Sequence, residues 1–173
     1  MKAESALSLL TELLTDLRQV QIQLVHWLPT FAARVNHPGL RHLIGKHGAE
    51  SSAHLVRLDG LFSLHDAIPE EGISKAFKLI IDGSDNEFPG NADPDQSDLI
   101  SLIQMLRIEQ FEITYYEIVA RVAEQLGFSD DTVMLQEFLA ERDSAASILR
   151  DLQSEMLKNA FPTQIPPEPL FPD

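Results

Sequence analysis

The sequence predicts an all-α protein built as a four-helix bundle, and three observations lead to this prediction. Apolar residues recur at helical spacing in four long segments, near residues 4–34, 38–65, 97–126 and 130–158. The first two segments are joined by a short connection and so are the last two, whereas the second and third are far apart. No stretch of useful length alternates apolar and polar residues as a β-strand would.

The first segment carries an apolar stripe that one polar residue interrupts near its middle. Gln21 fills the position where the next apolar residue is expected. Pro29 cannot donate a hydrogen bond to the carbonyl of Val25, so we expect a kink or a tightened turn there. The stripe consists of Leu7, Leu10, Leu14, Leu17, Leu24, Leu28 and Phe31.

The second segment begins at Asn36-His37-Pro38, where Asn36 can cap a helix and proline is tolerated in the first turn. Its stripe is also interrupted by polar residues near the middle, and Glu50 lies beside it. The stripe consists of Leu40, Ile44, His47, Ser51, His54, Leu58 and Leu61.

The connection over residues 66–96 discriminates between bundle topologies. Its apolar piece from Ile73 to Ile81 predicts a short helix, and the stretch from Asn86 to Pro94 has turn chemistry. A helix of ~28 residues is about 42 Å long, and the connection has enough chain to run back over that length. We therefore predict a ferritin-like four-helix bundle with one long crossover connection containing a short extra helix.

The third and fourth segments show the same interruption. The third starts near Asp95 or Ser97 and ends at Gly127, a residue suited to the position after a helix. Its stripe consists of Leu102, Leu106, Glu109, Ile113, Tyr116 and Ala120, with Glu112 one turn after Glu109. Ser129-Asp130-Asp131 can cap the fourth helix. The fourth stripe consists of Met134, Phe138, Glu141, Ala145, Ile148 and Leu152.

Domain organisation follows from these segments. Residues 1–160 form one bundle domain, and residues 161–173 form a proline-rich C-terminal tail. The tail cannot be helical, so we expect it to be extended or disordered. An alternative is a strap laid across a partner subunit, anchored by Phe161, Ile165, Leu170 and Phe171.

Composition excludes several classes of function. The 173 residues contain no cysteine, which rules out disulfides, thiolate zinc sites, iron–sulfur clusters and cysteine nucleophiles and fits a cytoplasmic protein. The net charge of −14 disfavours binding to nucleic acid. No apolar run reaches the ~18 residues of a membrane span, so we expect no membrane partner.

The interruptions of the four stripes fall at one depth of the bundle, because helix midpoints share one level. Buried carboxylates and imidazoles are costly unless they are paired or bound to a metal. Iron and manganese accept both ligand types, so the pattern predicts a metal site. Two alternatives stay open: a helix rotation would expose Glu50 and Glu112, and the histidines could be core residues. The candidate ligands are Gln21, His47, Glu50, His54, Glu109, Glu112 and Glu141.

Several of these motifs also carry a resemblance that covers about residues 7–156. They are Asp16-Leu17, Gln23-Leu24, Leu28-Pro29, His47-x-x-Glu50, Arg57-Leu58-Asp59, Ile108-Glu109-Gln110-Phe111-Glu112-Ile113 with Tyr116, and Ala123-Glu124-Gln125-Leu126-Gly127. Together they resemble the YciE/YciF-type ferritin-like proteins. That family consists of bacterial, stress-associated helical bundles that are often dimeric, are distantly similar to rubrerythrin and have no established reaction.

The resemblance implies roles for individual residues. Glu109 and Glu112 match the two carboxylates that such sites take from the third helix, Glu50 matches the second-helix carboxylate, and Glu141 is the best match on the fourth. The chain departs from the pattern at Gln21, where related sequences have Glu. It departs again at Ala53 and Ser144, where a Glu-x-x-His motif would place His; His47 or His54 could substitute.

These departures leave a single-metal site, a degenerate site and a metal-free cluster of Glu–His hydrogen bonds all open. The resemblance implies a homodimer that binds iron or manganese and has a protective redox role in the stress response. The alternative is a non-enzymatic, metal-free interaction protein that kept the bundle and a degenerate di-metal site.

Overall fold

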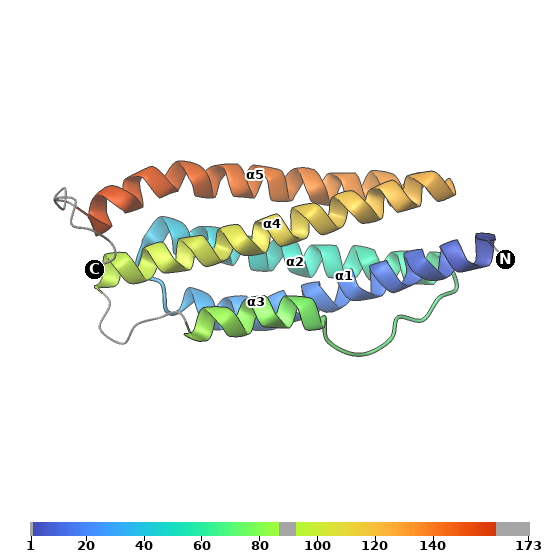
Figure 1. Cartoon of the computed structure of the whole chain (residues 1–173), viewed down its shortest axis with the longest axis horizontal. Helices are drawn as coiled ribbons and strands as arrows, with labels where there is room; N and C mark the ends of the chain where they lie inside the picture. The colour runs from blue at the N-terminus through green and yellow to red at the C-terminus, as the bar shows by residue number, and fades with distance from the viewer. Residues whose placement is uncertain (1, 87–92, 162–173) are drawn as a thin grey trace, which may run out of the picture.

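In the computed structural model, which describes residues 2–86 and 93–161, the chain folds into helices only (Figure 1). The helices are α1 (Lys2–Ala32), α2 (Pro38–Leu64), α3 (Lys75–Asn86), α4 (Pro94–Leu126) and α5 (Ser129–Ala160). The predicted all-α class is confirmed. Within the described ranges, none of the helices combines the length and the apolar character needed to cross a bilayer. Of the predicted tail, Phe161 is described and is 48% exposed; the prolines and the other anchors of the proposed strap lie outside the described residues.

Four long helices lie side by side in two antiparallel pairs, as Figure 1 shows. α1 packs against α2, α4 packs against α5, and α1 also contacts α4. The connection after α2 returns along the bundle and includes α3, so α4 starts at the end where α2 starts. This is the predicted ferritin-like topology with one long crossover and a short extra helix.

The turn between α1 and α2 is held by a carboxylate from α4. The backbone amides of Asn36 and His37 each donate to Asp98 at 2.7 Å. The expectation that Asn36 caps α2 is wrong: the cap is His37, whose Nδ1 accepts from the backbone amide of Leu40 at 3.2 Å. The Asn36 amide is instead bound by Asp98, a long-range contact that no local pattern reveals.

The expected cap of α5 by Ser129-Asp130-Asp131 is wrong: Phe128 occupies the cap position and no side chain caps the helix. Other helix ends follow local chemistry. α1 continues through Pro29 to Ala32. α4 ends at Gly127, whose φ of 79° lies in the left-handed region that favours glycine. α3 begins later than its apolar piece predicts and continues to Asn86.

The interior of the bundle consists of two apolar clusters, one toward each end. The first cluster includes Leu10, Leu14, Leu17, Leu58, Phe62, Tyr116 and Phe138. The second includes Val20, Leu24, Leu28, Ile44, Leu102, Ile108 and Leu149. On every long helix, the residues between the two clusters are those near the helix midpoint. The polar side chains predicted at mid-helix therefore lie at the level between the two apolar clusters.

Candidate metal centre

Six charged or amide side chains lie at this level, and we call them the charged layer. They come from all four long helices: Gln21 from α1, His47 and Glu50 from α2, Glu109 and Glu112 from α4, and Arg142 from α5. Five of the six are at most 2% exposed, and the side chain of Glu50 is 19% exposed. Groups so deeply buried must compensate one another's charge or bind an ion.

His47 lies between two carboxylates from α4. Its Nδ1 is 2.8 Å from Oε1 of Glu109, within hydrogen-bonding geometry. Its Nε2 is 2.8 Å from Oε2 of Glu112, but the angles at this second contact are not those of a hydrogen bond. Nε2 and Oε2 are therefore both buried without a hydrogen-bond partner.

Gln21 completes the surroundings of Glu112 from the opposite helix. Its Nε2 donates to Oε1 of Glu112 at 2.7 Å. Its Oε1 is buried and has no hydrogen-bond partner. Buried polar atoms are rarely left unpaired. His47 Nε2 and Glu112 Oε2 form an ion pair with each other, whereas Oε1 of Gln21 has no partner and could accept a further ligand beside Glu112.

The two carboxylates shift the pKa of His47 upward. Burial on its own lowers this pKa, but Glu112 and Glu109 outweigh it and raise the value to about 9. Burial likewise favours a higher pKa for Glu112, and the charge and contact of His47 overcome this and lower the pKa to about 2. Without a metal, this part of the layer at neutral pH is an imidazolium beside an ionised carboxylate.

Arg142 lies in the other half of the charged layer, beside Glu50 and Glu109. Its Nη2 is paired with Oε2 of Glu50, and its Nη1 is 3.5 Å from Oε2 of Glu109. Burial works against its charge, but Glu112, Glu109 and Glu50 raise its pKa above the ordinary value. Glu50 also accepts from Nζ of Lys46 at 2.5 Å, and the two cations outweigh burial and lower its pKa.

The presence of Arg142 in the interior corrects the predicted stripe of the fourth helix. Beyond Phe138, the buried residues are Arg142, Ala146, Leu149, Met156 and Ala160, whereas the predicted Ile148 is 41% exposed. The helix is thus rotated by about one residue relative to the prediction. Glu141, expected at the centre, has a side chain that is 43% exposed. The only signal for Arg142 was indirect: a layer of buried carboxylates requires a cation.

His54 and Glu141 form a separate pair at the edge of the layer. His54 Nε2 is 2.9 Å from Oε2 of Glu141, and its Nδ1 is 3.1 Å from the hydroxyl of Tyr116. The imidazole also stacks on Phe138, with 3.8 Å between ring centroids. Burial lowers the pKa of His54, and Arg142 adds to this effect against the opposing carboxylates. Burial also raises the pKa of Tyr116 well above its usual range, so its hydroxyl stays protonated.

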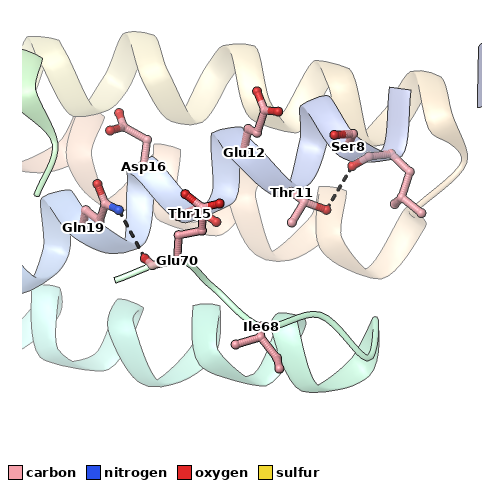
Figure 2. Close-up of a pocket in the computed structure, with 9 residues that line it drawn as sticks. Ser8, Thr11, Glu12, Thr15, Asp16, Gln19, Ile68 and Glu70 are labelled. Atoms are coloured by element: carbon pink, nitrogen blue, oxygen red, sulfur yellow. Dashed lines mark hydrogen bonds between the residues drawn. The ribbon is translucent and has the colours of Figure 1, made fainter. Parts of the chain in front are cut away.

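One surface hollow is lined by residues of the charged layer, and a larger one is not. A narrow hollow lined partly by Lys46, His47, Glu50 and Glu109 reaches the layer itself. A much wider one, of about 660 Å³, lies over α1 and the following connection. Figure 2 shows its lining, including the hydrogen bond from Gln19 to the backbone oxygen of Glu70. No residue of the charged layer lines the wide hollow, so its size does not make it the candidate site.

In the structure, the residues predicted as ligands fall into three groups. Gln21, His47, Glu109 and Glu112 meet in the interior. Glu50 joins them through Arg142, and His54 pairs with Glu141 at the edge. One ligand atom from each of His47, Glu109 and Glu112 lies within 4.8 Å of the others. This nitrogen and oxygen donor set suits iron or manganese, so the residues fit a metal ion.

Fold and site together define a ferritin-like helical bundle with a carboxylate–imidazole layer at its centre. The chain belongs to the DUF892 family, described as a domain of unknown function, which matches residues 5–161. None of the curated proteins matches the chain significantly.

Solved structures share the whole fold. YciF, a stress protein of E. coli, superposes with a TM-score of 0.84 at 21% identity, over 91% of this chain and 99% of that one. YcfI from Rhodopseudomonas palustris gives a TM-score of 0.79 at 24% identity, over 84% of this chain and 92% of that one. A protein from Xanthomonas campestris gives 0.73 at 15% identity, over 90% and 95%. The similarity to YciE/YciF-type proteins inferred from the sequence is confirmed.

Proposed function

We propose that this protein binds iron or manganese in the charged layer and that the bound metal serves a protective redox role in the stress response. The observation that carries the proposal is the group of ligand atoms on His47, Glu109 and Glu112, which lie within 4.8 Å of one another in the interior. The buried Oε1 of Gln21, which has no hydrogen-bond partner, supports it, because a cation would supply one. The stress role is supported by the similarity to YciF, which is described as a stress protein.

Different residues of the chain would bind the ion, exclude water and line the route of entry. His47, Glu109 and Glu112 would hold the ion, and Oε1 of Gln21 offers a further neutral oxygen. Bound iron or manganese would supply one-electron exchange with oxygen or peroxide. The two apolar clusters above and below the layer would keep bulk water from the site. The narrow hollow beside Glu50 is the supported route of entry.

Elemental analysis tests this proposal. We expect protein purified without chelator, or loaded with Mn²⁺ or anaerobic Fe²⁺, to retain metal after desalting. Glu112→Gln removes a proposed ligand and should weaken metal binding by about 10-fold or more. Glu117→Gln is the matched control on the same helix, because Glu117 is half-exposed and paired with Arg121. A metal content near zero in the loaded wild type would refute the proposal.

A second candidate function is a metal-free interaction protein, and Arg142 favours it. Arg142 and a protonated His47 place two positive charges among Glu50, Glu109 and Glu112, which compensates most of their charge without a metal. On this alternative, chelators and added metal leave the melting temperature unchanged. A rise in melting temperature with Mn²⁺ that Glu112→Gln abolishes would favour the metal-binding function instead.

The homodimer and the cytoplasmic location, both expected from the sequence, are also proposals. The homodimer is supported by an apolar hollow between α3 and α4 that is lined by exposed Leu79 and Ile103. Light scattering coupled to gel filtration should give twice the monomer mass of 19.4 kDa; the monomer mass at micromolar concentration would contradict it.

The cytoplasmic location, inferred from the lack of cysteine, is tested by cell fractionation.

A further inference from the structure

Arg142 is the largest fully buried side chain of the bundle and the one charged group of the layer that sequence reasoning did not anticipate. It reaches the layer from α5 and pairs with Glu50 of α2 and Glu109 of α4. A buried arginine without compensation is strongly unfavourable, so this position depends on both carboxylates.

Glu109 divides its two oxygens between two cationic groups. Oε1 is 2.8 Å from Nδ1 of His47, whereas Oε2 is 3.5 Å from Nη1 of Arg142. In bundles of this class, two-metal sites are built from carboxylates on facing helices, and the two ions lie about 3.5–4 Å apart. A carboxylate with one oxygen toward each of two cations is placed as a bridging ligand would be.

The layer therefore contains two cation positions. The first is surrounded by His47, Glu109 and Glu112, and Gln21, which contacts Glu112, has an oxygen without a partner. The second is surrounded by Glu50 and Glu109, and the guanidinium of Arg142 already fills it.

We propose that Arg142 occupies the second cation position, so that the layer accepts one metal ion rather than two; this rests on the proposed metal binding at His47. A metal can displace a proton from an imidazole, but a guanidinium keeps its proton at any physiological pH and cannot become a ligand. A second ion would have to expel a buried side chain and separate it from both carboxylates. Arg142 is thus a residue that determines metal stoichiometry.

Removing the guanidinium tests this assignment. Arg142→Gln removes the guanidinium from between Glu50 and Glu109, which keep Lys46 and His47 as their other cationic partners. The vacated position then lies between two carboxylates, a donor set that suits a divalent ion. Arg142→Lys is the matched control, because it keeps a positive charge at the same place. Arg150→Gln controls for loss of an arginine from the same helix, since Arg150 is exposed.

The measurements are Mn²⁺ bound per chain by equilibrium dialysis and the Mn²⁺ electron paramagnetic resonance spectrum. We expect about one ion per chain for the wild type, Arg142→Lys and Arg150→Gln, and about two for Arg142→Gln. The wild type should give the six-line signal of an isolated ion, and Arg142→Gln the broadened spectrum of two coupled ions. Circular dichroism checks that each variant folds.

The outcomes separate this inference from the proposed function. One ion in both the wild type and Arg142→Gln would overturn the inference and leave the proposed function standing. No ion in the wild type would refute the proposed function and, with it, the stoichiometry of one ion, whatever Arg142→Gln binds. If Arg142→Gln does not fold, the wild type decides: two coupled ions overturn the inference, and a saturated isolated ion supports it.

Discussion

The two halves of the charged layer hold their carboxylates with different kinds of cation. In one half, the imidazole of His47 lies between Glu109 and Glu112. In the other, the guanidinium of Arg142 lies between Glu50 and Glu109. A metal ion can displace the proton of an imidazolium, which is released to solvent, whereas a guanidinium keeps its proton. The layer therefore combines one exchangeable positive charge with one permanent charge, and only the first can be replaced by a metal ion.

The two buried histidines of α2 sharpen this contrast. Both are 2% exposed, and burial lowers the pKa of each. The pKa of His47 nevertheless rises to about 9 because two interior carboxylates contact it. The pKa of His54 falls, because burial and the charge of Arg142 outweigh the opposing effects of Glu141 and Glu112. Burial alone therefore does not decide the charge of a histidine; the number of desolvated carboxylates around it does.

The largest effect on stability is expected when Arg142, the permanent charge, is replaced. Arg142→Met removes the guanidinium from Glu109, which is buried, and from Glu50, so that only His47 and Lys46 remain as their cationic partners. Breaking a buried pair costs about 3–5 kcal/mol. Urea unfolding with chelator present measures this loss. Arg150→Met, at an exposed position, should change stability by no more than about 0.5 kcal/mol. If the two variants were equally stable, the guanidinium would not be a structural counter-charge.

The exchangeable charge should appear as a dependence of stability on alkaline pH. His47 has a folded-state pKa of about 9, above its unfolded value of 6.5. Its stabilisation is therefore fully present below pH 6.5 and is lost as the pH rises through 9. The loss should be on the order of 3 kcal/mol. Urea titrations of chelated protein at several pH values measure it.

His47→Gln is the control for this prediction, because it removes the titrating group and should flatten the profile between pH 6.5 and 9. Arg142→Lys should leave the profile's shape unchanged, since lysine keeps its charge over that range. A wild-type profile that is already flat would show that His47 is neutral in the folded protein.

A smaller effect is expected at the edge of the layer. Tyr116→Phe removes the hydroxyl 3.1 Å from Nδ1 of His54, which should cost about 1 kcal/mol of stability. Its ring still fills the apolar cluster, so packing is preserved. The Tyr116→Phe variant should bind Mn²⁺ with wild-type affinity. A large loss of affinity would instead place His54 and Tyr116 within the metal centre.

The smallest effect is expected for Glu141→Gln. The carboxylate is 43% exposed, and ion pairs open to solvent contribute only about 0–1 kcal/mol. Glutamine also retains an oxygen that can accept from His54. Thermal unfolding of Glu141→Gln and Glu112→Gln, measured side by side, compares the loss of stability at an edge carboxylate with the loss at an interior one. Equal effects of the two substitutions would contradict the division of the layer into interior and edge.

Much of this architecture can be read from apolar spacing. The stripe predicted for α2 is buried throughout, including His47, Ser51 and His54. On α1, Gln21 is buried as predicted, although Leu7 at the start of the stripe is 44% exposed. These assignments succeed because a helix with one wide apolar face can be oriented in only one way against its neighbours.

The orientation of α5 could not be read in the same way. Ala145 and Ile148 of the predicted stripe have equivalents one residue later, Ala146 and Leu149, so two rotations bury similar apolar surface. The choice between them decides whether Glu141 or Arg142 enters the interior. That choice depends on Glu50 and Glu109, which belong to helices distant in sequence.

The sequence by itself determined the class of fold, the crossover and the depth of the polar residues, because helical periodicity and connection length are local properties of the chain. Only the tertiary structure decided which of those residues meet and which cation faces which carboxylate. The reason is electrostatic: a charge becomes tolerable in the interior only through partners on other helices, and those partners are known only once the helices have packed.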